Sequence, residues 1–421
     1  MKARVLAVIL AVFLYNISPS QSVNVYGLMP SSNPNLDYVR LAELDALSGT
    51  IITIDSVKPV NAYGFGTSAF DSYHQTYSFI GVDPNQGFRF NSWGVMSDTM
   101  YAMPQVSVTI NDLEHDMKSL EFYGLGSYAI NAANGEYALR FMNIDQITGE
   151  VVELKKMPEA RAFPIGSTTY GSNDGIYYAN ILDNNFESKI YAIDAVTGDT
   201  NYTVPLLLPT GVDFMNFEYN NQDDLIYGLL RDYLNSWYAI GSIDPATGSI
   251  VDTIYEINDL QYFVQGASVF HQMSQNYLLY YTDNDNNSKL LSVDVFNRSM
   301  TANPTVPGYL SDLQVDNYEY VMTAYHNTVN TEDKPVKKID LQVYPNPAST
   351  FVNVVFDLNH DLPYCSLEVY DITMSTLLFQ KSIDTKLETK VTINTESFPT
   401  GVYIISLVTS KESTTKLFVV K

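Results

Sequence analysis

The chain of 421 residues contains one cysteine, two tryptophans and five histidines, and its 23 lysines and arginines face 47 acidic residues. Because Cys365 stands alone, the sequence predicts neither a disulfide nor a thiolate metal site. The formal net charge is −24. Between Val23 and His326 we count 12 basic and 36 acidic residues. Since phosphates and anionic headgroups are bound by clustered Lys and Arg, this scarcity argues against nucleic acid and anionic membranes as partners.

Long apolar runs are also missing. Beyond the N-terminus, no stretch reaches the roughly eighteen apolar residues of a transmembrane helix. The start, Met1-Lys2-Ala3-Arg4, is basic and is followed by an apolar run, Val5 to Tyr15, and by small polar residues. This order is typical of a secretory signal peptide, which we place at residues 1–22. A buried N-terminal strand is the alternative.

Local catalytic signatures are absent from the sequence as well. It has no His-x-x-x-His or His-Glu-x-x-His spacing, no Gly-x-Ser-x-Gly elbow, no P-loop and no dinucleotide fingerprint. The sequence therefore predicts no catalytic residue and no cofactor, and it leaves open whether the protein is an enzyme.

What the chain does contain is a repeat of about fifty residues. The pattern Asp-x-x-Ser/Thr-Gly occurs four times, and a fifth copy keeps the Asp but has Arg298 in place of the Gly. The repeat residues are Asp45 and Gly49, Asp145 and Gly149, Asp194 and Gly198, Asp244 and Gly248, and Asp294. The Asp positions step by 100, 49, 50 and 50. The double step implies a degenerate copy near residues 91–98.

Each copy lies between alternating strand patterns, such as 189–194 and 249–255, which indicates a hairpin. We interpret the repeated residues as structural, because an Asp carboxylate accepts the N–H groups of a turn and a Gly adopts the positive φ that closes it. A metal or catalytic array is the alternative. Two further strands precede each hairpin, so the sequence predicts an all-β fold in which residues 23–326 form a β-propeller.

Six periods predict six blades. The first unit begins at its second strand, 23–28, and the last segment, 312–325, is a strand pair without a hairpin. If these last strands complete the first blade, the ring closes without exposed sheet edges. Because 318–325 resembles a second strand, a partial seventh blade is the alternative.

The Asp-x-x-Thr-Gly turn resembles the repeat of quinoprotein-like propellers, which bind pyrroloquinoline quinone. Those repeats usually carry a Trp about four residues after the Gly, where this chain has Tyr202 and Asp252. The resemblance supports the propeller and argues against this cofactor.

After a polar linker at 327–338, residues 339–421 contain short alternating strands that predict a small, Ig-like antiparallel β-sandwich. This segment resembles the C-terminal sorting domain of cargo exported by the type IX secretion system of Bacteroidota. The residues that carry the resemblance are Tyr344, Pro345, Asn346, Pro347, Gly401, Tyr403 and the closing strand from Lys416 to Lys421. In one departure, the turn after Asp371 lacks the usual Gly. The resemblance implies a secreted or cell-surface protein whose partners are the type IX translocon and the sorting peptidase.

Three further features are candidates for function. His74 and His271 are expected at the first-to-second strand connections of different blades, where they could approach each other across the channel mouth or serve no role. The segment Asp283 to Ser288 resembles the start of a calcium loop but departs from it at Ser288 and Asp294, so an Asx-rich turn is the preferred interpretation and calcium the alternative. Of 32 tyrosines, 27 lie between Val23 and His326, which suits both strands and ligand platforms.

Three functions are consistent with these features. The first is an extracellular binding or adhesion module for a glycan or protein. The second is an extracellular carbohydrate-active enzyme, a hydrolase or lyase, whose site lies at one channel mouth. The third is a scaffold component of an outer-surface assembly.

Overall fold

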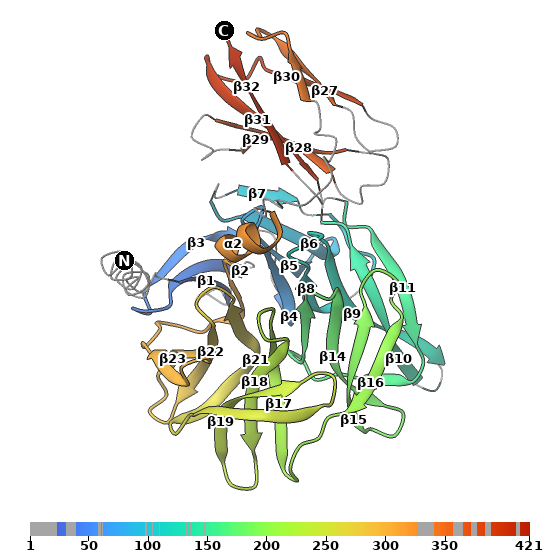
Figure 1. Ribbon diagram of the computed structural model, residues 1–421, viewed down its shortest axis with the longest axis vertical. Coiled ribbons are helices and arrows are strands. Elements are labelled where there is room, and N and C mark those ends of the chain that lie inside the picture. Colours follow the sequence, from blue (N-terminus) through green and yellow to red (C-terminus); the bar gives the residue numbers. More distant parts are fainter. Residues whose placement is uncertain are drawn as a thin grey trace, which may run out of the picture.

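The computed structural model describes residues 23–30, 39–57, 60, 62–96, 99–102, 104–108, 110–131, 134, 136–146, 148–326, 341–356, 365–371, 377–383, 389–409 and 413–421. The predicted signal peptide, the predicted linker and the last two positions of the degenerate repeat copy lie outside these residues. Within them, almost all regular structure is β (Figure 1).

Six antiparallel sheets surround a common axis, as an all-β propeller requires (Figure 1). From the axis outward, the first blade contains β25 (Ser311–Val315), β1 (Asn24–Pro30), β2 (Val39–Asp45) and β3 (Ile51–Val57). The second blade contains β4 (Ala62–Asp71), β5 (Thr76–Asp83), β6 (Gly87–Gly94) and β7 (Thr99–Ala102). The third blade contains β8 (Asn111–His115), β9 (Phe122–Asn131), β10 (Glu136–Ile144) and β11 (Val151–Met157). In the fourth blade, β12 (Ala160–Ala162) and β13 (Thr168–Gly171) both pair with β14 (Ile176–Asp183), and β15 (Ser188–Asp194) and β16 (Thr200–Pro205) follow. The fifth blade contains β17 (Val212–Asn220), β18 (Leu225–Asp232), β19 (Trp237–Asp244) and β20 (Ser249–Glu256). The sixth contains β21 (Leu260–His271), β22 (Asn276–Asp283), β23 (Ser288–Asp294) and β24 (Ser299–Ala302).

The ring is closed because the last strand of the propeller pairs with the first. β25 pairs with β1 as the innermost strand of the first blade, with Val315 opposite Val25. The first blade is thus completed from the C-terminal side, as the sequence predicts. The alternative of a partial seventh blade is wrong, because residues 318–326 form the short helices α2 (Tyr318–Val321) and η2 (Met322–His326). A backbone hydrogen bond from Val321 N to Asn317 O starts the helical turn, and Val321 is buried.

A unit of two blades repeats three times around the axis, and buried tyrosines mark it. Tyr77, Tyr177 and Tyr277, exactly 100 residues apart, are fully buried on the second strand of alternate blades. Their hydroxyls donate to backbone carbonyls of the preceding blade, at Asp312 (2.6 Å), Asp112 (2.6 Å) and Asn216 (2.7 Å). Each hydroxyl therefore satisfies a carbonyl at a blade boundary while its ring fills the core between blades.

The repeated Asp-x-x-Thr-Gly segments form the hairpins between the third and fourth strands. In the fourth blade, Asp194 Oδ1 accepts hydrogen bonds from Val196 N (3.1 Å) and Thr197 N (2.8 Å), and Gly198 has φ +74°. In the fifth copy, which starts at Asp294, Arg298 adopts the same left-handed conformation with φ +53°. The turn therefore persists without glycine, at the cost that a side chain pays there, about 1–2 kcal/mol.

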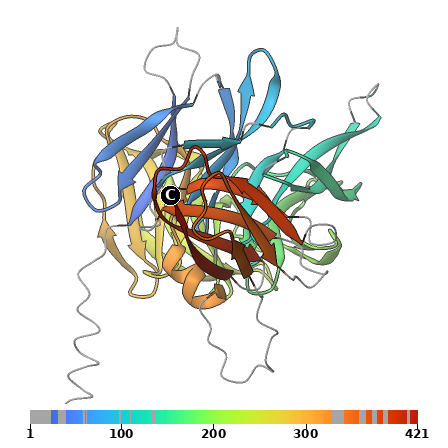
Figure 2. The ribbon, with the colours of Figure 1, turned by 90° about the horizontal axis from the view of Figure 1, so that it is seen from above.

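The C-terminal segment forms a sandwich of two sheets. One contains β26 (Leu341–Tyr344), β27 (Phe351–Phe356) and β30 (Lys390–Asn394); the other contains β29 (Leu377–Ser382), β28 (Cys365–Asp371), β31 (Gly401–Thr409) and β32 (Ser413–Val420). Residues of both sheets share one core, in which Cys365 is buried. Figure 2 shows the red strands of this sandwich in front of the propeller.

Candidate functional site

The propeller axis is closed at one end by three glycines. Gly66, Gly166 and Gly266 have φ values of +70°, +68° and +73° and belong to the inner strands of alternate blades or the residues just before them. A Cβ atom on Gly166 would lie 2.3 Å from the backbone N of Gly266, and one on Gly266 would lie 3.1 Å from the N of Gly66. The three backbones thus meet on the axis, and the channel is a blind pocket rather than a tunnel.

Above the glycines, a ring of three equivalent side chains separates an inner from an outer cavity. Glu114, Glu218 and Gln314 line both cavities, each with a volume of ≈ 60 Å³. Glu114 Oε1 accepts from Thr168 Oγ1 (2.9 Å), and Glu218 Oε1 accepts from the hydroxyl of Ser268 (2.8 Å). The third position differs, because Gln314 Nε2 donates to the carbonyl of Ser68 (3.1 Å). Two carboxyls and one amide therefore face a space that holds a few waters or one small group.

The carboxyls of the axis are electrostatically unusual. Burial raises the pKa of Glu114 well above its ordinary value, and the nearby charge of Glu218 raises it further. Burial also raises the pKa of Glu218 to about 8, although the hydroxyl of Ser268 opposes the shift. Among the described residues, no Lys or Arg borders either cavity. Near neutral pH these groups can therefore hold protons and act as hydrogen-bond donors as well as acceptors.

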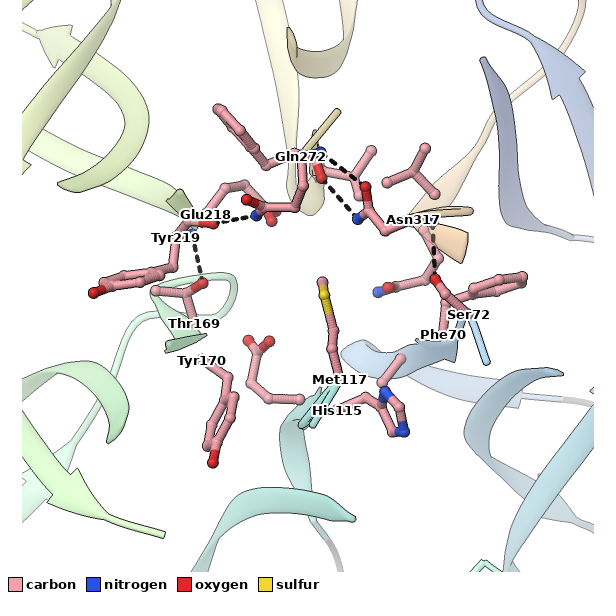
Figure 3. Close-up of a pocket in the computed structure, with 16 residues that line it drawn as sticks. Phe70, Ser72, His115, Met117, Thr169, Tyr170, Glu218, Tyr219, Gln272 and Asn317 are labelled. Carbon is pink, nitrogen blue, oxygen red and sulfur yellow. Dashed lines mark hydrogen bonds between the residues drawn. The ribbon is translucent and has the colours of Figure 1, made fainter. Parts of the chain in front are cut away.

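The rim of the outer cavity is held by hydrogen bonds between blades (Figure 3). Asn317 N donates to Ser72 Oγ (2.8 Å), Gln272 N donates to Asn317 Oδ1 (2.8 Å), and Gln272 Nε2 donates to the carbonyl of Tyr219 (2.7 Å). These side chains are committed to the scaffold, and so they fix the shape of the mouth. The thioether of Met117, in contrast, points into the middle of the pocket (Figure 3).

His115 is the other distinctive side chain of this wall. Its side chain is 3 % exposed, and neither ring nitrogen has a hydrogen-bond partner. Burial lowers its pKa, against the attraction of Asp71, whose Oδ2 lies 3.8 Å from Nε2. The ring is therefore neutral, and it lies against Phe122 with 4.7 Å between ring centroids.

The two histidines singled out from the sequence lie at the predicted strand connections but do not line either cavity. His271 ends β21, and its Nδ1 bonds to the hydroxyl of Ser274 within its own turn (2.6 Å). His74 lies in the β4–β5 turn and contacts Asp71 and Glu368. An enzyme site based on His74 would need two carboxylates of the propeller near this side chain. Because Glu368 belongs to the C-terminal sandwich, only one of the two contacting carboxylates, that of Asp71, comes from the propeller.

The predicted calcium segment forms a turn that satisfies its own carboxylate. Asp283 Oδ1 accepts from Asp285 N (3.0 Å) and Asn287 N (2.8 Å), and Oδ2 accepts from Asn287 Nδ2 (3.1 Å). These contacts are those of an Asx turn. Over the part of the chain that the structure describes, no group of three or more His, Cys, Asp or Glu side chains could hold a metal ion.

The repeat-turn aspartates lie on the outer hairpins, away from the axial cavities. Sequence reasoning missed Glu114, Glu218, Gln314 and His115. The available signal was the 100-residue spacing of Gly66, Gly166 and Gly266, which aligns the inner strands once the two-blade unit is recognised. Without that alignment, two glutamates cannot be chosen from the many acids.

The residues that resemble a sorting signal are joined to one another in space. Asn346 Oδ1 accepts from Val419 N (2.9 Å), and Asn346 Nδ2 donates to the carbonyl of Leu417 (3.2 Å). Pro345 and Pro347 flank this residue, both after cis peptide bonds, and Tyr344 precedes them. The opening motif thus holds the last strand, β32, which carries Lys416 and is followed by Lys421.

The second half of the signal lies on β31. Gly401 begins this strand, and a Cβ atom there would meet no atom closer than 3.8 Å, so the space around Gly401 does not require glycine. Tyr403 is buried between Phe398 and Phe418, and its hydroxyl donates to the carbonyl of Pro399. Tyr403 therefore connects β31 to both the preceding turn and the last strand.

Fold and tail together define a secreted β-propeller with a C-terminal sorting domain. Residues 342–421 match the family model described as "Secretion system C-terminal sorting domain", which is the type IX domain expected from the sequence. This domain directs the protein to the cell surface or the extracellular space, and it implies interaction with the type IX machinery. No helix among the described residues has the length and hydropathy needed to cross a membrane.

The solved structure of TolB supports the propeller-like fold. TolB from Acinetobacter baumannii superposes with a TM-score of 0.51 at 13 % identity, covering 72 % of this chain and 69 % of TolB. A protein from Bacteroides fragilis described as a 6-phosphogluconolactonase gives a TM-score of 0.42 at 10 % identity, covering 89 % of this chain and 99 % of that one. At 13 % identity the likeness to TolB concerns the fold alone. A search of curated proteins gives no match.

Proposed function

We propose that this protein is an extracellular binding module that holds a polar group of a glycan or protein in its axial pocket. The observation that carries the proposal is the pair of carboxyls, Glu114 and Glu218, at the level where the two cavities meet. Their pKa values are raised by burial, so each can exchange hydrogen bonds with hydroxyl or amino groups of a ligand. The closed glycine end favours a terminal or protruding group over a threaded chain.

The acidic character of the propeller supports the same conclusion. The lining of the two cavities contains three carboxyls, those of Asp112, Glu114 and Glu218, and no Lys or Arg, so it favours ligands that donate hydrogen bonds over anionic ones. A sugar ring with free hydroxyls and a protein amine both meet this requirement. The small cavity limits the buried part of the ligand to a few atoms, so the remaining contacts would come from the propeller face.

Arrays of glycans and of extracellular proteins, probed with the full mature chain with and without calcium, test this proposal. A ligand of the pocket should lose about tenfold in affinity when Glu114 and Glu218 are both replaced by Gln, since an ordinary hydrogen bond contributes about 0.5–1.5 kcal/mol and two carboxyl contacts are changed. Glu187→Gln, which changes an exposed carboxylate 65 % accessible to solvent, is the control. The proposal fails if no ligand appears, or if both variants bind as the wild type does.

A carbohydrate-active enzyme is the second candidate, and the same carboxyl pair favours it. Glycoside hydrolysis uses two carboxyls, one of which has a raised pKa and protonates the leaving group. Glu218 fits that description, because its pKa is raised to about 8. Turnover of a saccharide panel separates the two candidates: an enzyme loses turnover in Glu218→Gln while it still binds its substrate, whereas a binding module shows no turnover in either form.

A further inference from the structure

Part of one face of the sorting domain is buried, and it contacts the propeller. Along β28, Cys365, Leu367 and Val369 belong to the sandwich core, so Ser366 and Glu368 point to the opposite face of the sheet. That face is solvent-exposed in a sandwich that stands alone. Here Ser366 is completely buried and Glu368 is 2 % exposed. A surface therefore covers it, and the contact between Glu368 and His74 identifies the β4–β5 turn of the second blade as part of that surface.

The buried Glu368 carboxylate is surrounded by donors. His74 Nε2 lies 3.4 Å from Oε1, Ser366 Oγ donates to the same oxygen (2.8 Å), and the hydroxyl of Tyr370 donates to Oε2 (2.5 Å). Burial by itself raises the pKa of this carboxyl, but the hydrogen bond and charge of His74, together with the two hydroxyls, bring it below its ordinary value. Glu368 is therefore ionised, and the cation that compensates it comes from the propeller.

His74 is held between two carboxylates. Its Nδ1 lies 2.5 Å from Asp71 Oδ2, and its side chain is 7 % exposed. Burial lowers the pKa of an imidazole, but the charge of Asp71 and the hydrogen bonds to Asp71 and Glu368 outweigh it and raise the pKa of His74 to about 10. A protonated His74 thus links an acid of the propeller to an acid of the sorting domain. His115 also faces this cluster, and it is neutral.

The propeller repeats show that the turn itself does not need this pair. The equivalent turns of the fourth and sixth blades have Gly171 and Asp174, and His271 and Ser274, at the positions of Asp71 and His74. All three turns keep a residue with positive φ at the same place, Gln75, Gly175 and Gln275. Because the other two turns fold with different residues, the Asp71–His74 pair is not a folding requirement of the motif. It occurs in the blade whose turn contacts Glu368.

We propose that the outer face of the sheet β29-β28-β31-β32 is a specific docking surface for the second blade of its own propeller, with Glu368 as its charged anchor and His74 as the receptor. The sorting domain is then a docked partner of the propeller rather than a freely tethered one. Removal of one member of a buried charge pair leaves the other uncompensated, so the interface discriminates strongly against surfaces without an imidazolium at this position. The proposal is independent of what the axial pocket binds.

The test uses the full mature chain with a protease site inserted in the predicted linker at 327–338. After cleavage, analytical ultracentrifugation should find the two parts associated at micromolar concentration near pH 6. Glu368→Gln, an isosteric change, should weaken this association about tenfold, because the charge-assisted hydrogen bond from His74 becomes a neutral one while Asp71 still compensates the imidazolium. Glu396→Gln removes an exposed carboxylate of the same domain and should leave it within about twofold. Parts that separate in the wild type, or equal effects of the two variants, would overturn the proposal.

The pH dependence gives a second readout. Asp71 already raises the pKa of His74 in the free propeller, and docking adds the hydrogen bond and charge of Glu368, which bring it to about 10. The contribution of His74 to docking is therefore present while it is protonated in both states, and it is lost as the pH rises from its pKa in the free propeller toward 10. Association should therefore weaken steadily over this range in the wild type. His74→Gln should bind more weakly at pH 6, because Glu368 is then buried without a cation, and it should lack the decline that comes from deprotonation of His74, since His115 is neutral. A wild type whose association does not change between pH 6.5 and 10 contradicts the assignment of His74 as receptor.

Discussion

Replacement of Gly166 by alanine tests whether three backbones truly meet on the propeller axis. Gly166 has φ +68°, which costs a residue with a Cβ atom about 1–2 kcal/mol. Its new Cβ would also lie 2.3 Å from Gly266 N and 2.8 Å from Gly266 Cα, and this backbone cannot move without displacing Gly66. Such overpacking costs a further 1–3 kcal/mol, roughly, so we expect a total loss of about 2–5 kcal/mol.

Gly87→Ala is the matched control, because it isolates the conformational part of this loss. Gly87 has φ +81°, but a Cβ atom there would meet nothing within 4 Å. We therefore expect a loss of about 1–2 kcal/mol, which comes from the left-handed conformation alone. The difference between the two variants measures the contact on the axis.

Thermal unfolding followed by tryptophan fluorescence is a suitable assay. Both tryptophans, Trp93 and Trp237, lie on propeller strands, so the signal reports on the propeller and not on the sorting domain. At about 2 °C per kcal/mol for a domain of this size, Gly166→Ala should lower the Tm by about 4–10 °C and Gly87→Ala by about 2–4 °C. Equal Tm values for the two variants would refute the closed axis and, with it, the blind pocket.

Three further predictions follow from the same contacts. Tyr177→Phe removes the buried hydroxyl that donates to Asp112 O, so it should lower the free energy of unfolding in urea by about 1–3 kcal/mol. Tyr262→Phe, at a side chain 63 % exposed, should lower it by less than about 0.5 kcal/mol, and similar losses in the two variants would contradict the structural role of the tyrosines that recur every 100 residues. Asp244→Ala removes the acceptor of Ala246 N and Thr247 Oγ1 and should cost about 1 kcal/mol in the same assay; an unchanged midpoint would mean that the repeated Asp is not turn chemistry. The pKa of Glu218 is raised from 4.5 to about 8 in the folded state, so its contribution to stability is present below pH 4.5 and is lost as the pH rises toward 8. The Tm should therefore fall less steeply across this range in Glu218→Gln than in the wild type. Parallel curves of Tm against pH would refute the burial of this carboxyl.

The propeller itself was predictable because its signals are local. An Asp that accepts N–H groups two and three residues ahead, and a Gly with positive φ, form the same hairpin wherever they occur, so Asp194 and Gly198 indicate a turn without any knowledge of the neighbouring blades. Alternation within strands such as β15 and β19 then specifies which residues face the core. The short segment after β25 was ambiguous for the same reason, since the pattern at 318–325 fits both a strand and the helical turns α2 and η2.

The candidate site was not predictable to the same degree. Glu114 and Glu218 are 104 residues apart and Gln314 is another 96 away, so no fixed period identifies them as equivalent. They become neighbours because six inner strands converge on one axis. Likewise, nothing near Glu368 in the sequence indicates a partner, and its burial depends on a turn almost 300 residues earlier.

The sequence by itself determined the turns, the blade repeat, the acidic character of the propeller and the sorting tail, since these depend on composition and on contacts within a few residues. Tertiary structure alone decided that the axis is blind, that two glutamates share it, and that His74 joins the propeller to the sorting domain. The physical reason is the separation along the chain between the residues that interact. Turn and strand preferences act between near neighbours in the chain, whereas a raised pKa or a buried ion pair depends on which distant groups exclude water from the same space.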